Sequence, residues 1–166
     1  MLDTEGQQSG TAFVKGIPFV AYFQKVSAWA QGRPMLQVKD TLRATVNLSF
    51  DGRVFKVYHG PDARARFDNE VRVLRHLEAR GCGFVPRLLE ADAAQLRIVT
   101  TNCGARVEHL DAARSRELFA ELEAYGVRHD DPDLRNVTYR QSDGRFCVID
   151  FELAAILPDT TAPTLP

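Results

Sequence analysis

Residues 129–136 read His-Asp-Asp-Pro-Asp-Leu-Arg-Asn, a stretch too rich in charge and proline to continue a helix. The next residues, 137–149, predict a β-hairpin that turns at Ser-Asp-Gly, and Asp150 follows directly. An antiparallel pair brings the residue before its first strand beside the residue after its second. We therefore expect Asn136 next to Asp150. An amide oxygen and a carboxylate are hard ligands of the kind that Mg²⁺ accepts together with phosphate oxygens.

A further carboxylate lies in the same loop, because Asp131 comes five residues before Asn136 and two residues after His129. Beside a metal-bound phosphate, such a carboxylate could orient or deprotonate an attacking hydroxyl. Each of these residues alone is ordinary turn chemistry or packing. The acidic loop and the hairpin together indicate a metal-dependent nucleotide site.

The rest of the chain predicts an α+β protein without internal repeats, in which the first three strands form an antiparallel meander. The predicted strands are Met35–Lys39, Arg43–Phe50, Val54–Tyr58, Pro86–Asp92, Gln95–Thr101, Val137–Arg140 and Phe146–Ile149. The predicted helices run from Pro18 to about Gly32, from Pro61 to Arg80 with a stop at Gly81, and from the N-cap Asp111 to Gly126. Asn102-Cys103-Gly104 breaks the pattern as a linker would.

Two motifs in this order resemble the protein-kinase-like superfamily. Residues 129–136 match its His-x-Asp-x-x-x-x-Asn catalytic loop, and Asp150-Phe151-Glu152 resembles the Asp-Phe-Gly motif that follows it. The upstream order agrees as well, with a lysine strand at residues 54–57, a glutamate helix, two strands, a linker and a second helix. The resemblance implies an α+β, kinase-like fold with an antiparallel N-lobe sheet, one helix and a much reduced helical C-lobe.

The resemblance also implies that ATP and Mg²⁺ are the cofactors, and it gives roles to individual residues. Asp131 would be the catalytic residue that accepts or orients the hydroxyl. The metal ligands would be Asn136 and Asp150. The remaining nucleotide-binding residues that the resemblance implies are Lys56, its ion-pair partner Glu70, and Thr101 and Cys103 in the hinge between the lobes.

We expect one kinase-like domain over residues 1–166. Its expected parts are a tail with an extra helix (1–34), an N-lobe (35–104), a reduced C-lobe (105–157) and a second tail (158–166). No activation segment or helical substrate platform is expected after the reduced C-lobe, since prolines dominate the last residues. A second copy of the chain or a partner chain could complete that lobe.

Three features depart from the kinase pattern. Residues 38–44, where a glycine-rich loop would cover the phosphates, contain no glycine, so we expect a short turn that uses the Thr41 hydroxyl and nearby amides instead. Glu152 replaces the glycine of Asp-Phe-Gly, a variant that resembles choline-kinase-like and other small-molecule branches. Asp133 stands where many protein kinases have a lysine, and Arg135 could substitute for that lysine.

Composition argues against several other classes of protein. The 166 residues carry 21 Lys plus Arg against 22 Asp plus Glu, a net charge of -1, so we expect no nucleic-acid partner. No apolar run approaches the length of a membrane span, and the acidic amino terminus is unlike a secretory signal, so no membrane association is expected. The three cysteines form no CxxC pair and predict reduced thiols in a cytoplasmic protein.

The expected function is transfer of the ATP γ-phosphate to a hydroxyl, with protein Ser/Thr, including autophosphorylation, favoured as the acceptor because the expected site is open. A small molecule is the alternative acceptor. Because the glycine-rich loop is missing, a second alternative is that the chain is a non-catalytic kinase-like module that binds nucleotide or acts as a scaffold. A chance resemblance in an unrelated α+β domain is the last alternative, and it would be indicated by failure to bind any nucleotide.

Overall fold

The computed structural model describes residues 13–14, 17–18 and 35–158. The chain divides into two compact units, Met1–Met35 and Leu36–Pro166. In the first unit, β1 (Phe13–Val14) pairs antiparallel with β2 (Ile17–Pro18). Apart from Pro18, which belongs to β2, the helix expected over residues 18–32 lies outside the described residues.

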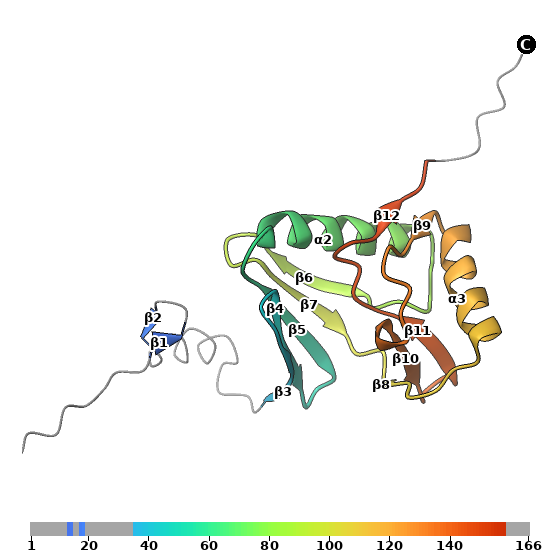
Figure 1. The fold of residues 1–166 in the computed structure, drawn as a ribbon, viewed down its shortest axis with the longest axis horizontal. Helices are drawn as coiled ribbons and strands as arrows, with labels where there is room; N and C mark the ends of the chain where they lie inside the picture. Colours follow the sequence, from blue (N-terminus) through green and yellow to red (C-terminus); the bar gives the residue numbers. More distant parts are fainter. Residues whose placement is uncertain (1–12, 15–16, 19–34, 159–166) are drawn as a thin grey trace, which may run out of the picture. The chain divides into compact units, whose positions relative to one another are not determined.

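A five-stranded antiparallel sheet begins the second unit, with the strand order β3-β4-β5-β7-β6 (Figure 1). Its strands are β3 (Met35–Asp40), β4 (Ala44–Ser49), β5 (Arg53–Tyr58), β6 (Leu88–Asp92) and β7 (Arg97–Thr101). The five strands predicted for this region are confirmed, with ends that shift by one or two residues. The register pairs Lys56 with Val46 of β4 and with Ile98 of β7, so a lysine stands between apolar residues at the centre of the sheet.

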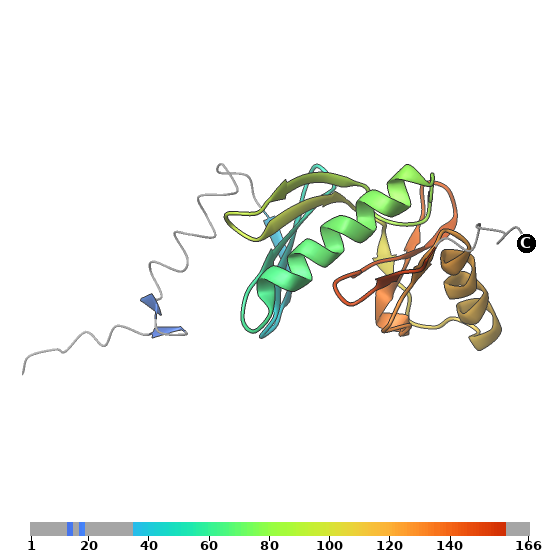
Figure 2. The same ribbon diagram turned by 90° about the horizontal axis from the view of Figure 1, so that it is seen from above.

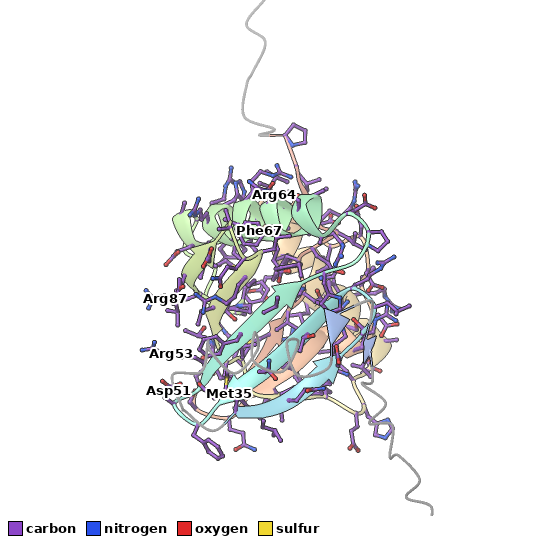
Figure 3. All side chains as sticks on the ribbon, turned by 90° about the vertical axis from the view of Figure 1, so that its left-hand side faces the viewer. Met35, Asp51, Arg53, Arg64, Phe67 and Arg87 are labelled. Carbon is purple, nitrogen blue, oxygen red and sulfur yellow. The ribbon has the colours of Figure 1, made fainter. Side chains whose placement is uncertain are left out.

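The helix α2 (Ala63–Ala79) lies across the sheet, and its C-terminal end reaches the elements that follow β7 in the chain, as Figure 2 shows from above. Apolar residues at helical spacing form its buried face, as predicted; they include Phe67, Val71, Leu74 and Leu77. Figure 3 labels Phe67, which is buried, and Arg64, which is one turn earlier and exposed. Gly81 follows the helix with a φ of +72°, the left-handed conformation that a helix C-terminus requires.

The second lobe, defined here as the elements after β7, is small and partly helical. Its helix α3 (Ala112–Ala124) starts at Asp111, whose carboxylate accepts hydrogen bonds from the N–H groups of Ala113 and Arg114, as expected of an N-cap. Beside α3 in Figure 1 lies a three-stranded sheet of order β11-β10-β8. Its strands are β8 (Ala105–Arg106), β10 (Val137–Arg140) and β11 (Arg145–Val148). Another two-stranded pair joins β9 (Val127–Arg128) to β12 (Ala155–Ile156).

A continuous hydrophobic core joins the five-stranded sheet, α2 and the second lobe. It contains Phe67 and Leu74 from α2, Leu122 from α3, Val137 from β10 and Phe151, all of them buried. This shared core holds the hairpin formed by β10 and β11 against the sheet. Among the residues that the structure describes, neither helix is long and apolar enough to cross a membrane.

Candidate active site

A buried lysine–glutamate pair joins the sheet to α2. Lys56 lies in the middle of β5 and Glu70 on the inner face of α2, and their Nζ and Oε2 atoms are 2.7 Å apart. Their side chains are 10% and 6% exposed, so both charges are withdrawn from water. Tyr58, two residues along the same face of β5, donates its hydroxyl to the same Glu70 oxygen. The structure thus brings together the lysine and glutamate that the sequence predicts as a pair.

The same lysine reaches the segment that follows the hairpin. Lys56 Nζ is 2.5 Å from Asp150 Oδ1 and 3.3 Å from Glu152 Oε2. Burial alone would lower the pKa of the Lys56 ammonium, but the carboxylates of Glu70, Asp150 and Glu152 together raise it. Lys56 therefore carries its full positive charge throughout the physiological pH range.

Asp150 stands between two lysines. Its Oδ1 atom faces Lys56, and its Oδ2 atom is 3.4 Å from Nζ of Lys39, the second-last residue of β3. Its φ of 69° is unusual for a residue other than glycine, and such backbone strain clusters at functional sites. Burial by itself raises the pKa of Asp150, but Lys56 and Lys39 outweigh burial and lower this pKa to about 2. Asp150 is therefore an anion at neutral pH.

Three neighbouring residues on one face of α2 hold the segment around Asp150 in place. Arg66 Nη1 lies 3.2 Å from Glu152 Oε2, and its guanidinium also donates to backbone carbonyls before α2. Asn69 donates from Nδ2 to carbonyls within residues 151–154, and Glu70 Oε1 accepts the Phe151 N–H at 3.3 Å. These contacts fix the position of α2 relative to the hairpin. They thereby also hold Glu70, Asp150 and Glu152 in place around Lys56.

The residues of the acidic loop 129–136 form a local network. His129 is buried; its Nε2 lies 3.1 Å from the carbonyl oxygen of Ile149, and its Nδ1 accepts the Asp131 N–H. Arg135 donates to both carboxylate oxygens of Asp131, at 2.8 and 2.6 Å, and Asn136 Nδ2 donates to Asp131 Oδ2 at 3.0 Å. The hydrogen bonds from Arg135 hold the pKa of the Asp131 carboxyl below its usual value. Asp131 is thus ionised and oriented by its own loop.

The pocket between the sheet and the hairpin has an apolar part and a charged part. Its apolar lining comes from strands β4, β5 and β7, through Val46, Leu48, Val54 and Ile98. Its charged lining comes from Lys39, Lys56, Glu70, Arg106, Arg135 and Asp150, and Asn136 is among its polar lining residues. A flat aromatic base suits the first part and phosphates suit the second, whereas the predicted catalytic Asp131 lies outside the lining.

The predicted hinge residues Thr101 and Cys103 both line this pocket, although several of their polar groups are already engaged. The Thr101 N–H donates to the carbonyl of Arg87, and its hydroxyl accepts the Arg87 N–H. The Cys103 carbonyl accepts the Thr138 hydroxyl at 2.8 Å. Within the described part of the chain, the Cys103 N–H forms no hydrogen bond.

The predicted metal ligands fit a small divalent cation. Asn136 uses its amide nitrogen on Asp131, which leaves the oxygen Oδ1 as the ligand atom, and both Asn136 and Asp150 line the pocket. Asp150 supplies an ionised carboxylate, the oxygen donor that Mg²⁺ prefers. Glu70, Asp150 and Glu152 also place carboxylate oxygens within 4.8 Å of one another, but Lys56 lies among them.

The ionisation of Asp150 makes stability depend on pH in a defined direction. A carboxyl whose pKa falls on folding, here from 3.8 to about 2, contributes stability above the unfolded pKa that is lost as the pH falls through the folded pKa. We expect the wild type to lose about 2 kcal/mol more than Asp150→Asn between about pH 5 and about pH 1.5. Urea unfolding of both proteins across this range measures the difference, and parallel pH profiles would contradict it.

Sequence reasoning missed four residues of this site: Lys39, Tyr58, Arg66 and, as an ion-pair partner, Glu152. Two of them carried a signal. Tyr58 is two residues after Lys56 and so shares its face of the strand, and Arg66 is one helical turn before Glu70. No sequence pattern pairs Lys39 with Asp150, because the two residues are 111 positions apart.

Comparison with known proteins identifies the fold. No protein-family model and no curated protein matches this sequence. Among solved structures, the ADP-bound aminoglycoside phosphotransferase APH(2'')-Ib is similar with a TM-score of 0.57 and 11% identity, over 83% of this chain and 72% of that one. The Rio2 kinase–ADP/Mg²⁺–phosphoaspartate complex from Chaetomium thermophilum is similar with a TM-score of 0.53 and 13% identity, over 81% of this chain and 52% of that one. This chain therefore spans about half the length of the Rio2 kinase structure.

The chain has a protein-kinase-like fold, with an antiparallel sheet, its helix and a reduced helical second lobe. This confirms the fold class that the two sequence motifs predict. Both similar structures contain ADP.

Proposed function

We propose that this chain is an ATP- and Mg²⁺-dependent phosphotransferase that moves the γ-phosphate to a hydroxyl. The observation that carries the proposal is the contact of one buried lysine, Lys56, with both Glu70 and Asp150. A lysine held on two sides by carboxylates presents a fixed positive charge at the charged end of a pocket whose other end is apolar. The kinase-like fold supports the same reading.

In the proposed reaction, the acceptor oxygen forms a bond to the γ-phosphorus while the bond from that phosphorus to the bridging oxygen breaks. ADP leaves with the electron pair of that bond, and the acceptor proton passes to Asp131. Because the pKa of Asp131 is lowered by Arg135, the carboxylate is a weak base and mainly orients the hydroxyl. Lys56 binds phosphate oxygens, and Glu70 holds the lysine.

Two further groups complete the proposed machinery. Asn136 and Asp150 would hold Mg²⁺, which when bound neutralises charge on the phosphates. Arg135 joins Asp131 to the pocket, since it contacts the first and lines the second. It can therefore balance charge on the transferring phosphoryl group, the role that a lysine two residues after the catalytic aspartate has in many protein kinases.

A Ser or Thr hydroxyl on a protein, including this chain itself, is the favoured acceptor. The side chain of Asp131 is 35% exposed and lies outside the pocket lining, so a hydroxyl can approach it from solvent. A small-molecule acceptor is the second candidate, because one of the similar structures is an aminoglycoside phosphotransferase. Incubation with labelled ATP, alone and with a mixture of aminoglycosides, separates the two: label on the protein supports the first, and label on the small molecule supports the second.

Calorimetric titration with ATP, with and without Mg²⁺, tests the nucleotide site itself. We expect Mg²⁺ to strengthen ATP binding by about tenfold or more in the wild type and to have no such effect in Asp150→Ala. Asp143→Ala is the matched control, because Asp143 lies in the turn of the same hairpin and pairs only with Arg140 among the described residues. A wild type that binds no ATP, or an Asp150→Ala variant that keeps the metal effect, would contradict the proposal.

A further inference from the structure

The turn between β3 and β4 engages several of its own polar groups in local hydrogen bonds. The Thr41 hydroxyl accepts hydrogen bonds from the N–H groups of Arg43 and Ala44, each at 3.2 Å, and the Thr41 N–H donates to the Ala44 carbonyl. The turn is short, as the sequence predicts, but these amides and this hydroxyl bond to one another. They are not available to bind phosphate in place of a glycine-rich loop.

A lysine lies just before this turn. Lys39 directly precedes the last residue of β3, lines the same pocket as Lys56, and places its Nζ 3.4 Å from Asp150 Oδ2. Its side chain comes from the edge strand of the sheet and contacts the carboxylate oxygen of Asp150 that Lys56 does not donate to. Two ammonium groups from different strands thus meet at one carboxylate.

The two lysines differ in how firmly they are held. Lys56 is 10% exposed and contacts three carboxylates, whereas Lys39 is 36% exposed and its one ion pair within the described residues, to Asp150, is long. An ammonium on a flexible stem with a single long contact can turn to a stronger anion at little cost. A polyphosphate in the charged part of the pocket is such an anion.

We propose that Lys39 is a second polyphosphate-binding residue, which supplies from a side chain the phosphate contact that the hydrogen-bonded amides of Thr41, Arg43 and Ala44 do not offer. This inference rests on the proposed nucleotide site and deepens it. Lys39 pairs with Asp150 when the pocket is empty, and it binds phosphate oxygens when Asp150 binds the metal ion. The occupant is the diphosphate or triphosphate of a nucleotide, and the base and ribose do not contact Lys39.

Calorimetry with adenosine, ADP and ATP, each in the presence of Mg²⁺, tests the role of Lys39. In Lys39→Met we expect the Kd for ADP and ATP to rise about tenfold while the Kd for adenosine stays within about twofold. Lys39→Arg should restore most of the lost affinity because the charge returns. The matched control is Arg64→Met, which removes one positive charge from the exposed side of α2 and should leave all three constants unchanged.

The outcomes separate this inference from the proposed function. If the wild type binds ADP more tightly than adenosine and Lys39→Met changes neither constant, the role of Lys39 is wrong and the nucleotide site stands. An equal loss for adenosine and ADP also overturns the inference, because Lys39 would then support the pocket as a whole. A wild type that binds none of the three compounds overturns the proposed function, and this inference with it.

Discussion

Replacing Lys56 with methionine should lower the free energy of unfolding by about 3–5 kcal/mol. The substitution leaves three carboxylates, those of Glu70, Asp150 and Glu152, within 4.8 Å of one another without the cation that lies between them. Breaking a buried pair by removing one partner is costly, because a buried charge is left without its cation. Glu70 bears most of this cost, since Asp150 keeps its ion pair with Lys39 and Glu152 keeps its ion pair with Arg66. Urea unfolding followed by circular dichroism at neutral pH measures the loss.

Two companion variants show whether the effect arises from uncompensated charge. Lys56→Met combined with Glu70→Gln should be more stable than Lys56→Met alone, since one of the stranded carboxylates is removed. Arg64→Met breaks an exposed pair with Asp68 on the same helix and should cost less than about 1 kcal/mol. A loss in Lys56→Met as small as that of Arg64→Met would refute the view that this lysine holds the carboxylate cluster together.

Asp131→Asn should lower kcat for phosphotransfer by about 10²- to 10⁴-fold, with little change in the Kd for ATP. The amide retains the shape of the carboxylate but loses the charge that, in the proposed reaction, would orient the hydroxyl and accept its proton. ATP affinity should be spared because Asp131 lies outside the pocket lining. Autophosphorylation and transfer to added acceptors, measured with labelled ATP, give the rates.

The neighbouring Asp130 offers a matched control for this substitution. Asp130 is exposed, pairs with Arg128, and has no contact with Asn136 among the described residues, so Asp130→Asn should leave kcat within about threefold of wild type. Equal rates in Asp131→Asn and the wild type would show that Asp131 has no role in the reaction. If Asp131→Asn and Asp130→Asn lost activity equally, the loss would come from a disturbed loop conformation and not from a specific role of Asp131.

The local pattern of the sequence was enough to predict most of the fold. Alternating strands, the Asp-Gly turn at residues 51–52 and the helical spacing of Phe67 to Leu77 are local signals, and each element they predict is present. The strands β8, β9 and β12 were missed because two residues are too few for an alternation to appear. These short strands form because the tertiary fold brings a partner strand beside each of them: β10 beside β8, and β9 and β12 beside each other.

Part of the candidate site was also readable from the sequence. The hairpin brings Asn136 opposite Ile149, one residue before the Asp150 that the sequence predicts beside it. The kinase-like order of Lys56 and Glu70 predicts their pairing, which the structure shows at 2.7 Å. The roles of these site residues in binding metal and nucleotide remain predictions. Motif spacing carries this information because the chemistry of phosphoryl transfer requires these residue types at fixed positions.

Only the tertiary structure decided which other charges meet at that site. Glu152 reads in the sequence as a variant of a motif, but in the structure it binds Arg66 of α2 and lies 3.3 Å from Lys56. Lys39 reads as a surface lysine on an edge strand, but it faces Asp150 from 111 residues away. The sequence by itself determined the elements and the motif residues, since those depend on near neighbours along the chain. The pairing of distant charges depends on how the sheet, α2 and the hairpin pack together, and local sequence does not encode that packing.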